Sequence, residues 1–342
     1  MDAPSPHRPP LAFEDFSPGM GGTADLPVVT RDAIVAFAGE YDPQSFHLDE
    51  EAATHSFVGE LIASGWHSCA LLMRAIADGL LLRSTCMGAP GVDEVRWLRP
   101  VRPGDALRLR WTVGEAKASR SRPEMGLVRF RFEMLRGDEP VLTQSNWIMF
   151  GRRLSAVPDG TGPAEEPSAA AIAAAPPPIP GERGPPSPFF DDLEVGASFD
   201  LGTYAFTAEA IVGFATEFDP QPFHLDPEAA RRSHFGGLCA SGWHTAAAWM
   251  KRWVEHRRAG DERARQAGQR PAMLGTSPGF RDLRWIKPVY AGDVVRYRST
   301  VLEKRPGALR RGWGLVAQHN TGENQRGERV FEFRGSVFWE KR

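Results

Sequence analysis

Cysteine, long apolar runs and net charge are all scarce in this 342-residue chain. The three cysteines, Cys69, Cys86 and Cys239, are too few and too scattered for a disulfide framework or a zinc cluster. We therefore expect them to be small apolar residues of a reducing compartment. No apolar run is long enough to cross a bilayer and the first residues carry no apolar signal core, which predicts a cytoplasmic protein without a membrane partner. A formal net charge of −2 predicts no nucleic-acid partner.

An internal repeat is the most informative feature that the chain does contain. The stretch 37–73 recurs without a gap as 214–250, and about 23 of the 37 aligned positions are identical. The polar residues Asp42 and His47 are kept in both copies. A buried core could be repeated with apolar residues alone, so the retained acid and imidazole point to a functional site.

The similarity between the two halves extends beyond this stretch. RWLRPVRPGD at 96–105 matches RWIKPVYAGD at 284–293. Between the halves lies a segment rich in proline, alanine and glycine, which buries too little apolar surface to fold and predicts an extended linker. We expect an N-terminal domain at 10–152, the linker at 153–187 and a C-terminal domain at 188–342.

Each half shows the same order of secondary structure. A short amphipathic helix (31–41, and 208–218 in the second half) ends at an Asp-Pro pair, because the residue before proline is pushed out of the α region. A short acidic helical turn follows, and then a longer apolar helix with a serine at its N-cap. The last third of the first half is strand-like, in three segments: 106–113, 127–135 and 141–150. One long helix followed by antiparallel strands predicts an α+β fold in which the sheet wraps around that helix.

The repeated acid and histidine are the candidate catalytic residues: Asp42 with His47, and Asp219 with His224. The proline after each aspartate prevents a continuous helix, so a turn can bring both side chains together. A carboxylate beside an imidazole can activate water, because one group takes the proton while the other orients the oxygen. The alternative is structural: the aspartate caps a turn and the histidine is a core residue. A metal pair is disfavoured, because no third ligand lies at a suitable spacing.

The motif Ala-Ser-Gly-Trp-His opens the long helix in both halves, at 63–67 and 240–244. Backbone N–H groups at a helix start favour a developing negative charge, and Gly65 and Gly242 would let a ligand carbonyl approach the backbone closely. This is the geometry of an oxyanion hole. The alternative is that each glycine permits tight packing of the helix on the sheet.

Other polar residues of the repeat have a structural interpretation with a functional alternative. We interpret His67 and His244 mainly as packing residues, with a place in the pocket left open. Cationic residues flank the Trp-x-x-Pro-Val motifs and could meet a phosphorylated carrier, although charges on a solvent-facing strand edge are the more usual explanation: Arg96, Arg99, Arg284 and Lys287. The same two interpretations apply to five arginines expected in loops: Arg120, Arg122, Arg305, Arg310 and Arg311.

The two acid–histidine segments resemble the signature of the MaoC-like dehydratase and R-specific enoyl-CoA hydratase family. That signature is an aromatic residue followed by Asp-x-Asn-Pro-aliphatic-His-x-acidic, and here the segments are YDPQSFHLD (41–49) and FDPQPFHLD (218–226). Gln44 and Gln221 replace the asparagine, phenylalanine replaces the aliphatic residue, and Ser45 replaces the proline. The altered polar residue bears on the substrate more than on the reaction.

The resemblance implies two tandem hot-dog domains, each a long central helix wrapped by an antiparallel sheet, packed as a pseudo-dimer. It further implies a hydro-lyase that adds water reversibly to a trans-2-enoyl thioester. Asp42 with His47, and Asp219 with His224, would activate the water. No cofactor is implied beyond the CoA or acyl carrier of the substrate. The substrate-binding residues implied at the helix starts are Ser64, Gly65, Ser241 and Gly242.

Two other functions remain open at this point. The same fold supports thioester hydrolysis with other residues, and a non-catalytic thioester-binding protein would keep the motifs without turnover. Assembly beyond the internal pair, as a further homo-oligomer, is also open. The second half carries an insertion at 257–279, whose charge density favours a solvated loop over a segment that reshapes the second pocket.

Overall fold

The computed structural model describes residues 9–153, 187–306 and 311–342. The linker predicted for 153–187 therefore lies outside the described residues, except at its two ends. Within the described ranges, no helix has the length and apolar character needed to cross a membrane.

The described strands form one antiparallel sheet, to which each half contributes five neighbouring strands. Their order is β1-β3-β4-β5-β2-β7-β10-β9-β8-β6. In the first half the strands are β1 (Gly21–Asp25), β2 (Gly91–Trp97), β3 (Leu107–Ala118), β4 (Met125–Arg136) and β5 (Glu139–Gly151). In the second half they are β6 (Ser198–Ala205), β7 (Gly279–Trp285), β8 (Val294–Pro306), β9 (Trp313–Glu323) and β10 (Arg329–Glu340).

The helices follow the same order in both halves. The first half contains η1 (Phe13–Asp15), α1 (Arg31–Tyr41), α2 (Ser45–Leu48), α3 (Glu50–Thr54), α4 (Gly65–Gly79) and η2 (Leu81–Arg83). The second half contains η3 (Phe190–Asp192), α6 (Ala208–Phe218), α7 (Pro222–Leu225), α8 (Pro227–Arg232) and α9 (Gly242–Gln266). The side chain of Thr30 caps α1 and that of Thr207 caps α6, and each helix ends at the aspartate before proline.

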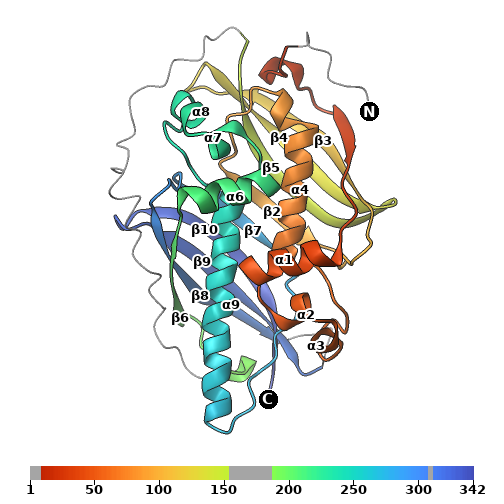
Figure 1. The fold of residues 1–342 in the computed structure, drawn as a ribbon, viewed down its shortest axis with the longest axis vertical. Coiled ribbons are helices and arrows are strands. Elements are labelled where there is room, and N and C mark those ends of the chain that lie inside the picture. Colours follow the sequence, from red (N-terminus) through yellow and green to blue (C-terminus); the bar gives the residue numbers. More distant parts are fainter. Residues whose placement is uncertain (1–8, 154–186, 307–310) are drawn as a thin grey trace.

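The long helices α4 and α9 lie against one face of the sheet, with the short helices of both halves around them (Figure 1). Their buried sides carry core residues, among them Leu72 and Ile76 of α4. The α+β fold with one long helix on the sheet in each half is therefore confirmed. Aromatic rings of α1 and α6 interlock between the halves: the ring of Phe37 meets Phe218 edge-on at 5.5 Å, and that of Tyr41 meets Phe214 at 5.6 Å.

The two halves join where β2 pairs with β7 in the centre of the sheet. The pairing has a pseudo-twofold symmetry, since Gly91 faces Arg284 while Arg96 faces Gly279. Both glycines allow close approach of the two strands. A Cβ on Gly91 would lie 2.1 Å from the carbonyl oxygen of Leu283, which is far inside contact distance. The sheet is therefore continuous between the halves only because these positions lack a side chain.

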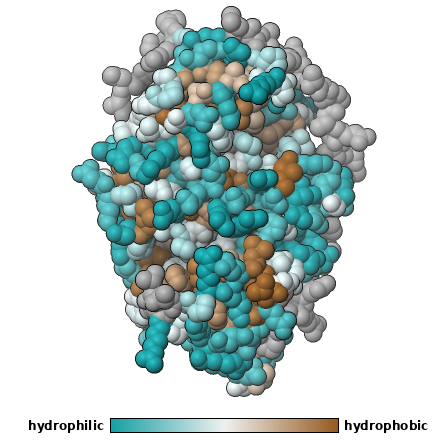
Figure 2. Space-filling model, turned by 180° about the vertical axis from the view of Figure 1, so that it is seen from behind, coloured by the Kyte–Doolittle hydropathy of each residue, from teal (hydrophilic) through white to brown (hydrophobic). Residues whose placement is uncertain are grey.

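The other face of the sheet is turned toward solvent. Along β3 buried and exposed residues alternate strictly from Leu107 to Gly114, as expected for a strand with one face on the core. Figure 2 shows the molecule from this side, which is mostly hydrophilic with scattered apolar patches. We therefore expect the functional site on the helix-covered side of the sheet.

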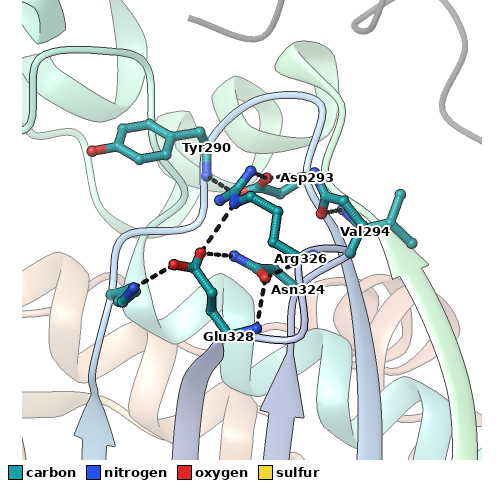
Figure 3. Close-up of polar contacts among 8 residues, drawn as sticks. Tyr290, Asp293, Val294, Asn324, Arg326 and Glu328 are labelled. Carbon is teal, nitrogen blue, oxygen red and sulfur yellow. Dashed lines mark hydrogen bonds and ion pairs between the residues drawn. The ribbon is translucent and has the colours of Figure 1, made fainter. Parts of the chain in front are cut away.

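The repeated Gly-Asp turn has a structural role. In the second half the carboxylate of Asp293 accepts a hydrogen bond from the backbone N–H of Tyr290 at 2.9 Å and one from Arg326 at 3.3 Å (Figure 3). Asp105 accepts the equivalent bond from the backbone N–H of Arg102, also at 2.9 Å. These bonds fix the turns that lead into β8 and β3, which explains why the motif is kept in both halves without a catalytic role.

The insertion at 257–279 is neither a solvated loop nor a wall of the second pocket, so both interpretations were wrong. Its first part continues α9 to Gln266, whereas α4 of the first half ends at Gly79. Its later part turns back to the sheet, where Leu274 bridges to Trp339. There it lines the cavity beside Asp42 and His47 of the first half.

Candidate active site

The turn after α1 brings the first acid and histidine together. Asp42 caps the C-terminus of α1, and the single turn of α2 carries His47 back toward it. The distance from His47 Nε2 to Asp42 Oδ2 is 3.5 Å, and both side chains are buried. The Asp-Pro pair thus produces the close pairing that a continuous helix would forbid.

Two neighbouring side chains fix the orientation of the Asp42 carboxylate. Gln44 Nε2 donates a hydrogen bond to Oδ1 at 2.9 Å, and Ser64 Oγ donates one to Oδ2 at 2.5 Å. Ser64 Oγ also accepts a bond from the backbone N–H of Trp66 at 3.1 Å, so the same hydroxyl caps α4. The helix start therefore holds the acid in place.

A backbone carbonyl fixes the tautomer of His47. Its Nδ1 lies 2.7 Å from the carbonyl oxygen of Ile62. A carbonyl can only accept, so Nδ1 carries the hydrogen and Nε2 of the neutral ring is an acceptor. Nε2 and Asp42 Oδ2 are thus two acceptors placed side by side at the cavity.

The second half repeats this geometry almost unchanged. Asp219 Oδ2 and His224 Nε2 are 3.5 Å apart. Asp219 accepts from Gln221 at 2.9 Å and from Ser241 at 2.6 Å, while His224 Nδ1 lies 2.8 Å from the carbonyl oxygen of Cys239. Burial lowers the pKa of His224, although the nearby Asp219 carboxylate acts in the opposite direction. The imidazole is consequently held in its neutral, proton-accepting form.

Each acid–histidine pair opens into a cavity whose far wall comes from the other half. The first cavity has a volume of about 330 Å³ and is lined by Asp42, His47 and Gly65, with Trp249 and Gln318 opposite. The residues of the far wall were missed by sequence reasoning, because no local pattern indicates which strands meet in space.

The second cavity has a volume of about 420 Å³ and the same composite construction. Asp219 and His224 face Met73, Ile76 and Gln144 of the first half. Of the predicted substrate-binding residues, Ser241 and Gly242 line this cavity and Gly65 lines the first, whereas Ser64 lies behind the surface of the first cavity and contacts Asp42.

The glycines at the helix starts serve packing as well as access. A Cβ on Gly65 would lie 2.6 Å from the ring of Trp97, and one on Gly242 would lie 2.1 Å from the ring of Trp285. The indole of Trp285 also donates a hydrogen bond to the carbonyl oxygen of Gly242 at 2.9 Å. Each glycine therefore admits a tryptophan on one side while its first-turn N–H, which has no partner within a helix, is left for the cavity.

His67 and His244 lie outside both cavities. The ring of His67 stacks on Phe37 with centroids 4.6 Å apart, and that of His244 stacks on Phe214 at 4.8 Å. Burial, with a smaller contribution from His47 or His224 nearby, lowers the pKa of each to about 3 from 6.5. They are packing residues held neutral in the core.

These two histidines predict a loss of stability on acidification. The pKa of each histidine is lower in the folded protein than in the unfolded chain, so the unfolded chain binds protons that the folded protein does not. The stability that this difference contributes is fully present above pH 6.5 and is lost as the pH falls toward 3. When the pH is lowered from 8 to 5, we expect each of the two histidines to reduce the unfolding free energy by about 2 kcal/mol.

Urea unfolding of a His67→Leu variant measures this contribution. The variant should lose about half of the pH dependence that the two buried histidines cause. A His55→Leu variant is the control, since His55 is exposed and its replacement should leave the slope of unfolding free energy against pH unchanged. An undiminished slope in His67→Leu would contradict the assignment.

Three exposed cations lie at the rims of the cavities. Arg99 lines the first cavity, while Arg122 and Lys287 line the second. Each of them is paired with a glutamate: Arg99 with Glu139 at 3.0 Å, Arg122 with Glu124 at 2.8 Å, and Lys287 with Glu328. Exposed ion pairs therefore lie at the solvent end of each cavity, and the acid–histidine pair at its buried end.

A long helix on an antiparallel sheet in each half, with composite pockets between the halves, defines a double hot-dog protein. The chain belongs to the MaoC-like dehydratase family: the model of the MaoC-like domain matches residues 20–129 and again 193–321. Both segments of acid and histidine fall inside these matches.

Comparison with solved structures supports the fold of the whole chain. A MaoC-domain protein of Chloroflexus aurantiacus is similar over 99% of both chains, with a TM-score of 0.77 and 17% identity. A conserved hypothetical protein of Mycobacterium tuberculosis, described as having a double hot-dog fold, is similar over 95% of this chain and 97% of its own, with a TM-score of 0.67 and 17% identity.

Two sequence relatives each match less than half of this chain. The uncharacterised protein YdeM of Bacillus subtilis is 33% identical over 147 residues, which are 43% of this chain and 95% of that protein. Nodulation protein N of Rhizobium meliloti is 31% identical over 145 residues, which are 40% of this chain and 89% of that protein. A chain of two such units agrees with the internal repeat.

Proposed function

We propose that the chain catalyses the reversible hydration of a trans-2-enoyl thioester to the 3-hydroxyacyl thioester, and does so at both cavities. The observation that carries this proposal is the pairing of two acceptors, His47 Nε2 and Asp42 Oδ2, 3.5 Å apart on the same cavity as the first-turn N–H of Gly65. The second half repeats it. One side of the cavity can hold water and the other can hold a carbonyl oxygen.

The paired acceptors suit a single water molecule. Both of its O–H groups can donate, one to Asp42 Oδ2 and one to His47 Nε2, which leaves a lone pair of the oxygen free to attack. As that oxygen bonds to C3, Nε2 takes the proton. The resulting imidazolium is stabilised by the Asp42 carboxylate on one side and by the Ile62 carbonyl, which accepts from Nδ1, on the other.

The helix start receives the charge that this attack creates. Electrons move from the C2–C3 double bond to the thioester oxygen, where the N–H of Gly65 or Gly242 and the positive end of the helix dipole stabilise the enolate. The histidine then returns its proton to C2 and the carbonyl re-forms. Because one pair supplies both the hydroxyl and the proton, both add to the same face of the double bond.

The placement of charge supports a phosphorylated carrier at the open end. Arg99 at the first cavity, and Arg122 and Lys287 at the second, are exposed, whereas the acid–histidine pairs are buried. Phosphate groups of CoA or of an acyl carrier would meet these cations while the acyl group enters the cavity.

Crotonyl-CoA tests the proposed reaction. We expect the absorbance of the conjugated enoyl thioester to fall on addition of the full-length protein, with no thiol released to a thiol reagent. Release of free thiol at the same rate would show a thioesterase. An unchanged absorbance with enoyl-CoAs of four to ten carbons would contradict hydration altogether.

A further inference from the structure

The far wall of each cavity carries a pair of buried carboxamides from the other half. Gln318 and Asn320 of β9 line the first cavity, and Gln144 and Asn146 of β5 line the second. None of the four side chains is more than 4% exposed. An apolar acyl chain would need no such groups, and buried amides cost free energy unless they are hydrogen-bonded.

The two pairs do not occupy duplicated positions. The backbone N–H of Leu98 donates to the carbonyl oxygen of Val141 in β5, and that of its counterpart Ile286 donates to the carbonyl oxygen of Val330 in β10. These equivalent bonds align β5 with β10. This alignment places Phe333 and Gly335 where the first half has its amide pair.

Strand β4 aligns with β9, because Gly126 and Gly314 each pack on an aromatic ring of the preceding 3-10 turn. In this alignment Gln318 and Asn320 occupy the positions at which the first half has Phe130 and Phe132. Duplication alone would have placed the amides on the same strand in both halves. Each cavity has therefore gained the same polar pair from a different strand, which is expected if the ligand requires it.

In the second cavity the hydrogen bonds show which amide atom is left for a ligand. Asn146 Nδ2 donates to the carbonyl oxygen of Trp147 at 3.4 Å, so Asn146 Oδ1 faces Gln144 and accepts a bond from its Nε2 at 3.0 Å. Gln144 Oε1 is then buried without a partner among the described residues. A buried acceptor in this state is matched by a ligand that brings a donor.

We propose that the second cavity selects an acyl group that carries a hydrogen-bond donor, such as a hydroxyl, beyond the reacting carbons, and that this donor binds Gln144 Oε1. The inference rests on the proposed function, since the acyl thioester must occupy this cavity. Phe132 is the direct strand neighbour of Gln144, and Met73 and Ile76 add apolar surface to the same cavity. A terminal carboxylate is disfavoured, because Gln144 Oε1 presents an acceptor to it.

Catalysis by the second site alone tests the selection. The full-length chain carrying Asp42→Asn and His47→Ala is assayed with hex-2-enoyl-CoA and with its 5-hydroxy and 6-hydroxy derivatives. We expect at least one hydroxylated substrate to have a kcat/KM about tenfold higher than the unsubstituted one, as for one buried hydrogen bond. Adding Gln144→Met should abolish that preference. Gln318→Met, the matched change in the other cavity, should leave it intact.

Three outcomes would overturn the selection: a preference for the unsubstituted chain, equal rates for all three, or a preference that survives in Gln144→Met. Should Gln144→Met not fold, the double change Gln144→Met with Asn146→Leu removes both amides and must abolish the preference in the same way.

Binding of saturated thioesters separates this inference from the proposed reaction. Calorimetry with hexanoyl-CoA and 5- and 6-hydroxyhexanoyl-CoA requires no turnover. Tighter binding of a hydroxylated ligand that is lost in Gln144→Met supports the selection even if no enoyl-CoA is hydrated, in which case only the reaction is wrong. Equal affinities alongside active hydration overturn the selection alone, and binding of none of them overturns both.

Discussion

Replacing His47 and His224 together by alanine should lower the rate of enoyl-thioester hydration by about a thousandfold, the usual contribution of a positioned general base. Each ring accepts the proton of the attacking water in its own cavity, so both must be lost. The single variants should each retain the turnover of the unaltered site, since the two Asp–His distances are equal at 3.5 Å and both rings are fixed by a backbone carbonyl. The loss of crotonyl-CoA absorbance measures all three proteins.

His55→Ala is the matched control, because His55 is an exposed histidine of the same segment. Its activity should equal that of the unmodified protein. If the double variant kept full activity, the acid–histidine pairs would not be the catalytic groups. If His224→Ala alone abolished turnover, the first cavity would be inactive and would serve only as a partner wall.

Gly91→Ala should lower the unfolding free energy by about 3 kcal/mol, a large overpacking effect. The new Cβ would be built 2.1 Å from the carbonyl oxygen of Leu283, in the strand pair that joins the halves. Because each cavity is lined from both halves, we expect activity to fall at both sites at once, unlike in the single histidine variants.

Chemical denaturation of Gly91→Ala and Gly39→Ala measures this effect. Gly39 lies inside α1, and a Cβ there would meet nothing within 4 Å, so alanine should stabilise the helix by about 0.5–1 kcal/mol. Equal stabilities for the two variants would show that the β2–β7 pair does not join the halves as closely as the geometry requires.

The sequence predicted the elements that hold the active-site residues, because local chemistry determines them. Thr30 caps α1, the Asp-Pro pair ends it, and Ser64 caps α4. The exact repetition of Asp42 and His47 in the second half made them candidates without any structure. Each of these signals lies within a few residues of the feature that it specifies.

Other parts of the site could not be predicted, since they depend on contacts between distant segments. The first half was expected to contain three strands, and β1 and β2 were missed. Of these, β2 is short and has glycine and charged residues in place of a long apolar alternation. The amides Gln144 and Gln318 lie on unrelated strands, so the repeat itself conceals them.

The composite cavities also explain why one chain contains two copies of the domain. Trp249 and Trp253 of α9 narrow the first cavity, while Met73 and Ile76 of α4 line the second, so each half shapes the acyl space of the other. The two acid–histidine pairs are nearly identical, but the walls that face them differ. We therefore expect the same reaction at both sites with different acyl preferences.

Hydration in water enriched in oxygen-18, followed by mass spectrometry of the product, tests the central claim most directly, because it shows which carbon the activated water attacks. We predict that the label appears in the hydroxyl at C3 of an intact 3-hydroxyacyl thioester, and that the His47→Ala/His224→Ala protein fails to introduce it. Label found instead in a free carboxylate, with the double bond retained, would contradict the account.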